Sequence, residues 1–323
     1  MADFTDNPLF KNDLRPMPYW AVLAEDKLQA WADGKAEGYS TGFPTFDKYF
    51  RLVGGEMTVI AARPSQGKTI LGVQLAENVA RQLQANGDGG SVAIFSAEMT
   101  GWSLVVRMAG ALSGVNTHKL RMGQGQQDDI GKLRAALAEL KRLPIWIDDG
   151  SAPTTKSMLD QLVDLNETNP IRMMLFDFME LGGDRAQSEE LRVGQIAIGL
   201  KDIAKRLKIP VVALSQLNRG VEDRANKMPG LADLRYSGQI EQVADVVAFI
   251  MRPEYYAERG MTIQVEDKAD LKGVAYLSIA KNRHGPVANV KLAFVKQLSK
   301  FAELATIAVV GTNGAVSYRQ VAP

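Results

Sequence analysis

The sequence of 323 residues contains no cysteine. This absence excludes disulfide bonds, thiolate metal sites and a cysteine nucleophile, and it suits a protein of the reducing cytoplasm. Histidine is scarce as well, since only His118 and His284 are present, and a histidine-rich zinc site is therefore excluded.

Long apolar runs and an excess of one charge are also missing. No run reaches the roughly 18 apolar residues of a membrane-spanning helix, so we expect no membrane partner. The first residues include Asp3, Asp6 and Pro8 where a signal peptide needs an apolar core behind basic residues. A formal net charge of +1 leaves the partners open, because a nearly neutral protein can still gather basic residues on one surface.

Apolar runs alternate with helical patterns from Gly38 onward, which favours one large α/β core. The expected strands are residues 57–62, 91–96, 145–148, 173–177, 210–215 and 245–251, and most are separated by expected helices at 67–85, 127–143, 155–168 and 190–207. Such alternation predicts a mainly parallel sheet with helices on both faces and ligands at the carboxyl ends of its strands.

The sequence pattern changes after Arg252, where short apolar segments replace the helical patterns. Strands are expected at residues 275–280, 287–294, 302–310 and 315–320, with Asn313-Gly314 as a hairpin turn. The sheet should therefore end in antiparallel strands. At the other end of the chain, residues 1–23 look irregular and residues 23–34 form a short amphipathic helical pattern.

A short loop between an apolar run and a helical pattern carries the strongest signal. Strand, loop and helix in this order are the context that a phosphate-binding loop needs, because loop N–H groups and the helix N-terminus then point at the phosphates, and Gly67-Lys68-Thr69 lies at this place. We expect a nucleoside triphosphate here, with the Lys68 ammonium on its terminal phosphates and the Thr69 hydroxyl on Mg²⁺. The predicted cofactor-binding residues are Arg63, Pro64, Ser65, Gln66, Gly67, Lys68 and Thr69.

Ala62 stands where the GxxxxGK[ST] pattern has its first glycine. A strand-end residue with negative φ can carry a Cβ, whereas Gly67, which we expect to pack against the phosphates, cannot. The competing interpretation is a chance Gly-Lys-Thr in an ordinary loop.

Two acids at predicted strand ends supply the remaining chemistry. Asp177 ends an apolar strand, as does the Walker B aspartate that holds Mg²⁺, although a strand-end aspartate can also cap a helix. Some ATPases take the catalytic base from a second acid directly after this aspartate. Here Phe178 follows Asp177, so the base must come from elsewhere. Glu98 ends a strand that we expect beside the P-loop strand, and it can orient and deprotonate the attacking water. A first-turn glutamate favoured by the helix dipole is the alternative.

Gln216 lies at a third predicted strand end, within Leu214–Arg219. A neutral donor and acceptor at this position can sense the γ-phosphate, and loss of that phosphate then releases the following loop. The simpler interpretation is an amide that braces the loop.

In this order, the motifs resemble the motor domain of DnaB-type replicative helicases over approximately residues 38–300. The resemblance rests on residues 62–69, 95–99, 175–177, 214–219, 233–245 and 281–285. The elements Ser-Gln-Leu-Asn-Arg, Ser-Gly-x-Ile-Glu-Gln and Lys-x-Arg-x-Gly separate this family from other RecA-like ATPases.

The resemblance implies a RecA-like domain that assembles into a hexameric ring around single-stranded DNA and hydrolyses ATP with Mg²⁺ between subunits. Residues acting in cis would be Lys68, Thr69, Glu98, Asp177 and Gln216. Lys281 and Arg283 match the basic pair that reaches the neighbour's phosphates, where a guanidinium stabilises transition-state charge. From spacing alone, this pair is equally a charged strand end beside a Gly-Pro turn.

The family's DNA-facing loops map onto the segment after Gln216 and onto residues 233–238. Candidates for phosphate contacts are Arg219, Arg235 and the backbone at Gly238, followed by Arg224, Lys227 and Arg185. Tyr236 stands where relatives commonly carry glutamate, and it can either stack on a base or pack the loop. A site that tracks the backbone is salt-sensitive and has no sequence preference.

The implied activity is an ATP-driven helicase that moves 5′→3′ on single-stranded DNA; the alternative is a RecA-like assembly or regulatory ATPase without unwinding. Only about 37 residues precede Gly38, where family members carry a helical domain and a linker helix. We therefore expect an N-terminal arm (1–37) whose helix serves as the linker, and a motor domain (38–323). This suggests a compact phage or plasmid type, acting in a bacterial or phage-infected cell, with a primase or loader as a further partner.

Overall fold

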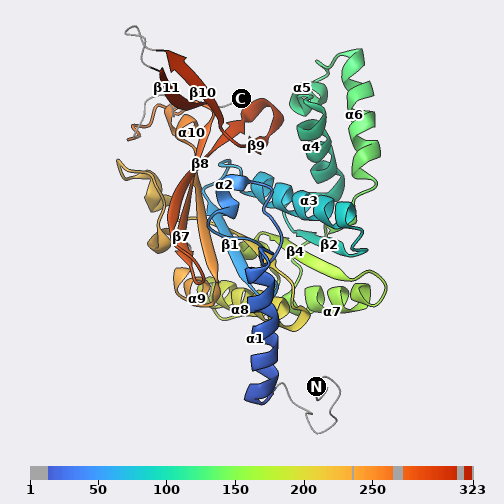
Figure 1. Ribbon diagram of the computed structural model, residues 1–323. Coiled ribbons are helices and arrows are strands. Elements are labelled where there is room, and N and C mark those ends of the chain that lie inside the picture. The colour runs from blue at the N-terminus through green and yellow to red at the C-terminus, as the bar shows by residue number, and fades with distance from the viewer. Residues whose placement is uncertain (1–13, 235, 265–271, 311–315, 322–323) are drawn as a thin grey trace. The chain divides into compact units, whose positions relative to one another are not determined.

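The structure is a computed structural model that describes residues 14–234, 236–264, 272–310 and 316–321 (Figure 1). By internal contacts the chain divides into residues 1–38 and residues 39–323. The first unit holds helix α1 (Met17–Ala32), which buries none of its residues. The expected start at Leu23 is wrong, because Pro16 is the N-cap and a second proline lies in the first turn, where a missing N–H costs little.

The second unit is built on one sheet of nine strands. In spatial order these are β3 (Ile145–Asp148), β2 (Ser91–Ser96), β4 (Ile171–Asp177), β5 (Val211–Gln216), β1 (Met57–Ala62), β6 (Val246–Met251), β7 (Val274–Asn282), β8 (Ala288–Val295) and β9 (Lys300–Ala302). The strands from β3 to β6 are parallel, and β7, β8 and β9 add antiparallel edges. The predicted fold class is confirmed.

The order of the strands differs from expectation at one place. β2 does not lie beside β1, because β4 and β5 occupy the positions between them. After β1 the chain passes through α3 (Lys68–Asn86) and enters the sheet again as β2, two positions away from β1. β4 and β5, which come later in the sequence, occupy the two positions between them. A strand–helix–strand connection looks the same in sequence whether the second strand lies next to the first or two positions away. The sequence pattern therefore does not give the strand order.

Helices cover both faces of the sheet (Figure 1). On one face, Leu71 and Leu75 of α3 pack in a core with Ile60 of β1. On the other, Ile196 and Leu200 of α8 (Glu189–Leu207) share a core with alternate residues of the same strands. β1 is buried along its whole length, as a strand covered on both sides must be.

The other described helices are α2 (Pro44–Asp47), α4 (Gly101–Ser113), α5 (Thr117–Arg121), α6 (Gln127–Leu140), α7 (Thr155–Asn166), α9 (Ser237–Val243) and α10 (Pro253–Ala257). α4 follows Glu98 and packs against α6, and the sequence pattern did not indicate it. None of the helices described is long and apolar enough to cross a bilayer.

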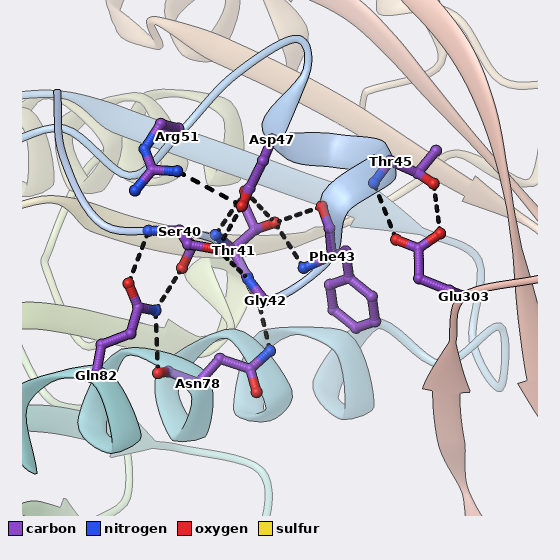
Figure 2. Close-up of polar contacts among 10 residues, drawn as sticks. All are labelled: Ser40, Thr41, Gly42, Phe43, Thr45, Asp47, Arg51, Asn78, Gln82 and Glu303. Atoms are coloured by element: carbon purple, nitrogen blue, oxygen red, sulfur yellow. Dashed lines mark hydrogen bonds and ion pairs between the residues drawn. The ribbon is translucent and has the colours of Figure 1, made fainter. Parts of the chain in front are cut away.

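A polar network fixes the start of the second unit (Figure 2). Asp47 accepts hydrogen bonds from the backbone and the hydroxyl of Thr41, both at 2.7 Å. Asn78 of α3 donates to the Thr41 carbonyl at 2.8 Å, and the backbone N–H of Thr45 donates to Glu303 at 2.9 Å. The network joins the segment before β1 to α3 and to the residues after β9.

The last strands form a separate two-stranded antiparallel sheet, β10 (Ala305–Val310) and β11 (Val316–Val321). The expected strand at 302–310 is therefore two strands, because β9 ends at Ala302. The proposed Asn313-Gly314 turn lies outside the described residues.

Candidate nucleotide-binding site

The loop that follows β1 leads directly into α3, whose N-cap is Gly67. Ala62 is the last residue of β1 and is not in the left-handed region, so its Cβ is tolerated as expected. Gly67 has φ +100°, and a Cβ there would lie 2.9 Å from the Cζ atom of Phe301. The nearest atoms to that position belong to the rings of Phe301 and Phe294, while Gly67 itself lines the cavity described below; its packing against phosphates stays a prediction.

Buried contacts of Gln66 and Arg252 hold this loop in place. Gln66 is fully buried (0% exposed) and its Oε1 accepts a 2.7 Å hydrogen bond from the Arg252 backbone. The Arg252 guanidinium donates to the Ser65 carbonyl at 3.1 Å and stacks 3.7 Å from the centre of the Phe294 ring. Burial lowers the pKa of Arg252 to about 10. Gln66 therefore shapes the loop from within, and its side chain does not line the cavity.

A cavity of about 390 Å³ opens above the loop. Its walls come from the P-loop, from the segment after β2, from α4 and from the end of β5. The lining residues are Ala62, Arg63, Pro64, Ser65, Gly67, Lys68, Thr69, Ile70, Glu98, Met99, Arg107, Phe178, Gln216 and Ser299. The structure thus brings together Lys68, Thr69, Glu98 and Gln216, which the sequence placed at separate strand ends.

Lys68 and Asp177 form the electrostatic centre of the site. The Lys68 ammonium lies 3.7 Å from Asp177 Oδ1 and 3.5 Å from the centre of the Phe178 ring. Burial lowers the pKa of Lys68, and the charges of Asp177, Glu180 and Glu98 oppose that shift. Because Lys68 also lines the cavity, its ammonium can form charge-assisted hydrogen bonds with phosphate oxygens there.

Asp177 has the properties of a metal ligand. It is 1% exposed, and neither carboxylate oxygen has a hydrogen-bond partner among the described residues. Its charged partner is the Lys68 ammonium at 3.7 Å, and both oxygens keep unused acceptor positions, which is costly in a buried site unless a ligand fills them. Its oxygens, and the hydroxyl of Thr69 that lines the cavity, are hard ligands, so the chemistry of these donors fits Mg²⁺.

Arg107 of α4 lines the cavity and was missed by the sequence reasoning. Burial lowers its pKa, while the charges of Asp177 and Glu98 act in the opposite direction. The only signal was a single basic residue within the apolar segment 104–109.

Glu180 was also missed. It lies in a short 3₁₀ turn, η1 (Met179–Leu181), just after β4. One carboxylate oxygen accepts hydrogen bonds from Ser215 Oγ at 2.7 Å and from the Gln216 backbone at 2.8 Å. Burial raises the pKa of this carboxyl group.

Lys281 and Arg283 lie at the opposite end of the sheet from the cavity. Arg283 Nη1 is 2.9 Å from Asp245 Oδ1, and the other Asp245 oxygen accepts a 2.8 Å hydrogen bond from the backbone of Met57, the first residue of β1. Lys281 donates to the Glu241 carbonyl. β1 extends roughly 17 Å from Met57 to Ala62 at about 3.3 Å per residue. The P-loop begins only after Ala62, at the far end of the strand.

The two segments expected to face DNA lie side by side. Leu217 and Leu234 form an antiparallel bridge, and the Asn218 N–H donates to the Asp233 carbonyl at 2.9 Å. Arg219, Gly238 and Arg185 are exposed, and Tyr236 has φ 63°. Arg235 lies outside the described residues.

Two of the weaker DNA candidates have partners within the chain. Lys227 is 5% exposed and donates to the carbonyls of Glu222 and Arg224 at 2.7 and 3.0 Å. Its ammonium therefore braces the loop in this conformation and is not presented to a phosphate. Arg224 is ion-paired with Asp233 yet half-exposed, so it keeps part of its guanidinium accessible.

Comparison with known proteins gives one family. Residues 38–303 match the DnaB-like helicase C terminal domain. The replicative DNA helicase DnaB of Geobacillus stearothermophilus is 38% identical over 279 residues, which are 84% of this chain and 58% of that protein. The replicative DNA helicase DnaC of Bacillus subtilis (strain 168) is 38% identical over 276 residues, 83% of this chain and 58% of that protein. The chain thus spans about 58% of the length of these relatives.

Solved structures agree with the sequence match. One solved ATPase domain has a TM-score of 0.80 and 31% identity, covering 91% of this chain and 100% of that chain. A DnaB-like replicative helicase, described with its interactions with primase, has a TM-score of 0.77 and 30% identity, covering 91% of this chain and 68% of that one. The predicted resemblance is confirmed: the chain belongs to the DnaB-like helicase C-terminal domain family.

Proposed function

We propose that the protein is an ATP-dependent DNA helicase that moves along single-stranded DNA as a homo-oligomeric ring, a hexamer by family resemblance. Family membership supports this proposal, as do the P-loop cavity and the cluster of Lys68, Glu98, Asp177 and Gln216 around it. The proposed cofactors are ATP and Mg²⁺.

One observation carries the proposal. Arg283 is fixed at the amino end of β1 through Asp245, while the P-loop lies at the carboxyl end of the same strand. A guanidinium held there does not reach the nucleotide of its own chain. It is available to a neighbouring copy, and a site that needs a residue from a neighbour makes hydrolysis depend on assembly.

Each residue has a proposed role in hydrolysis. Asp177 and Thr69 would hold Mg²⁺, which when bound neutralises charge on the phosphate oxygens. Lys68 contacts the terminal phosphates, and Glu98 accepts a proton from the attacking water. Gln216 contacts the γ-phosphate, while Arg283 and Lys281 of a neighbouring copy stabilise the charge that develops on the transferred group.

The DNA path is proposed to follow the paired segments after β5 and before α9. Exposed Arg219 and the Gly238 backbone are the described candidates, and Arg224, Arg185, Tyr236 and the undescribed Arg235 complete the set. These loops follow Gln216 directly in sequence, so a change of contact at the γ-phosphate reaches them over a short stretch of chain.

The proposed partners and setting follow the family. A primase or a helicase loader is the proposed protein partner, and the cytoplasm of a bacterial or phage-infected cell is the proposed location. The α1 helix is proposed to serve as the linker that docks on a neighbouring motor domain.

A strand-displacement assay on forked DNA tests the function. The wild-type protein with ATP and Mg²⁺ should displace a strand from forks that offer a 5′ single-stranded arm, and forks with only a 3′ arm should remain intact. Lys68→Ala is the matched control and should displace neither. DNA-stimulated ATPase without displacement on any fork would favour the RecA-like assembly or regulatory ATPase and contradict the helicase.

A further inference from the structure

The carboxylate of Glu180 joins two strand ends that the sheet itself leaves unjoined. The ladder between β4 and β5 pairs Met174 to Phe176 with Val211 to Ala213 and stops there. Beyond it, Glu180 Oε1 accepts from Ser215 Oγ at 2.7 Å and from the Gln216 N–H at 2.8 Å. The end of β5 is therefore tied through this side chain to the turn that follows Asp177.

Gln216 is consequently held from two sides. Its partner in β1 is Ala62, the residue before the P-loop, and its other tether is Glu180. Three segments of the nucleotide site thus meet at Gln216: the P-loop strand, the strand bearing Gln216, and the turn after the proposed Mg²⁺ ligand.

The second oxygen of Glu180 is buried without a hydrogen-bond partner among the described residues, and its charge acts on Lys68. Burying a carboxylate with an unsatisfied oxygen is costly, and such groups concentrate where position matters to function.

We propose that Glu180 is a positioning residue that sets the place of Gln216 relative to the γ-phosphate and thereby sharpens discrimination between ATP and ADP. The inference rests on the proposed function only in taking Gln216 as the group that contacts the γ-phosphate. Glu180 itself contacts neither nucleotide nor metal; it acts through Gln216.

Nucleotide affinity tests the inference without requiring hydrolysis or unwinding. The quantity measured is the ratio of affinities for AMP-PNP and ADP, both with Mg²⁺, by calorimetry on the full chain. Glu180→Leu removes both acceptor contacts and should lower this ratio about tenfold, as the loss of hydrogen bonds to a charged group predicts. ADP affinity should change little. Glu180→Gln keeps an oxygen that accepts both hydrogen bonds, and it should restore most of the ratio.

A double-mutant cycle separates positioning from a general loss of structure. If Glu180 acts through Gln216, then adding Glu180→Leu to Gln216→Ala should lower the ratio no further. Should Glu180→Leu fail to fold, Ser215→Ala replaces it: this variant removes one of the two donors and should lower the ratio about threefold.

The contradicting results are distinct from a failure of the helicase proposal. An unchanged ratio in a folded Glu180→Leu protein, or additive losses in the cycle, would overturn the role of Glu180. If Glu180→Leu does not fold, an unchanged ratio in Ser215→Ala has the same meaning. Equal affinities of the wild-type protein for both nucleotides would overturn Gln216 as the sensor and Glu180 with it. Loss of unwinding alone would leave the inference standing.

Discussion

Asp245 holds Arg283 through a 2.9 Å contact between Oδ1 and Nη1, while its second oxygen accepts a 2.8 Å hydrogen bond from the backbone of Met57. Lys201 of α8 adds a 2.6 Å ion pair to the same carboxylate. The proposed trans-acting guanidinium is thereby anchored to the first residue of the strand whose far end forms the P-loop. If Arg283 moves when it binds a neighbour's nucleotide, the movement would pass through Asp245 to Met57 at the start of β1.

Replacing Asp245 tests this anchor. Asp245→Asn removes the buried charge and leaves the Lys201 ammonium without its ion-pair partner, so the free energy of unfolding should fall by about 3 kcal/mol in urea titrations. Asp202→Asn on α8, beside Lys201 in sequence, is the control, because it breaks an exposed pair with Arg206; its effect should stay below about 0.5 kcal/mol. Equal effects of the two substitutions would contradict the anchoring role.

Glu98 and Lys68 should fail in different ways. Glu98→Gln should retain nucleotide binding while ATP turnover falls by about two orders of magnitude or more, the effect of losing a general base. Lys68→Ala should weaken nucleotide binding itself, because it removes the buried ammonium near Asp177. Steady-state ATPase and equilibrium binding, measured side by side, separate the two. Near-normal hydrolysis by Glu98→Gln would end its assignment as the base.

The P-loop glycine should not tolerate a side chain. Gly67→Ala places a Cβ at φ +100° and 2.9 Å from the Phe301 ring, so thermal unfolding should shift down and nucleotide binding should fall. Gly131→Ala is the control, since that helical position is open and its φ is ordinary; it should stabilise the protein by up to about 1 kcal/mol. A neutral Gly67→Ala would show that the loop relaxes freely.

Arg219 and Lys227 should separate DNA contact from loop bracing. Arg219→Ala should weaken binding to all single-stranded sequences alike and reduce the slope of log affinity against log salt by about 0.7. Lys227→Ala should leave that slope unchanged and lower the free energy of unfolding by about 2 kcal/mol, because two carbonyls lose their buried donor. An unchanged slope for Arg219→Ala would move the DNA contact to Arg185, Arg224 or Arg235.

Local patterns in the sequence predicted the strands well. The bounds of β1, β2 and β3 match expectation because each is an apolar run enclosed by turn residues. The P-loop was predicted from the Gly67-Lys68-Thr69 sequence together with the strand before it and the helix after it. The strand order did not follow from pattern, and Glu98 was placed beside the P-loop strand although β4 and β5 intervene.

The missed residues depend on contacts between distant segments. Glu180 matters because β4 and β5 are neighbours, which brings it to Ser215 and Gln216 across 35 and 36 positions of sequence. The Asp245 contact with Met57 spans 188 positions. An acid three residues after Asp177 was the only local signal for Glu180. Asp245 opened an expected strand and ended the motif 233–245, but nothing local indicated its contact with Met57.

The most direct test of the shared nucleotide site is the ATPase activity of mixed assemblies. Arg283→Ala subunits keep Lys68 and the rest of their own nucleotide site but lack the guanidinium that acts on a neighbour. Lys68→Ala subunits keep that guanidinium but have a defective site of their own, so each protein alone should be nearly inactive. In an equal mixture that forms common rings, about a quarter of the interfaces combine both intact parts, and a comparable fraction of wild-type activity should return. Wild-type hydrolysis by Arg283→Ala alone, or no recovery in rings proven to be mixed, would contradict a site completed by a neighbouring copy.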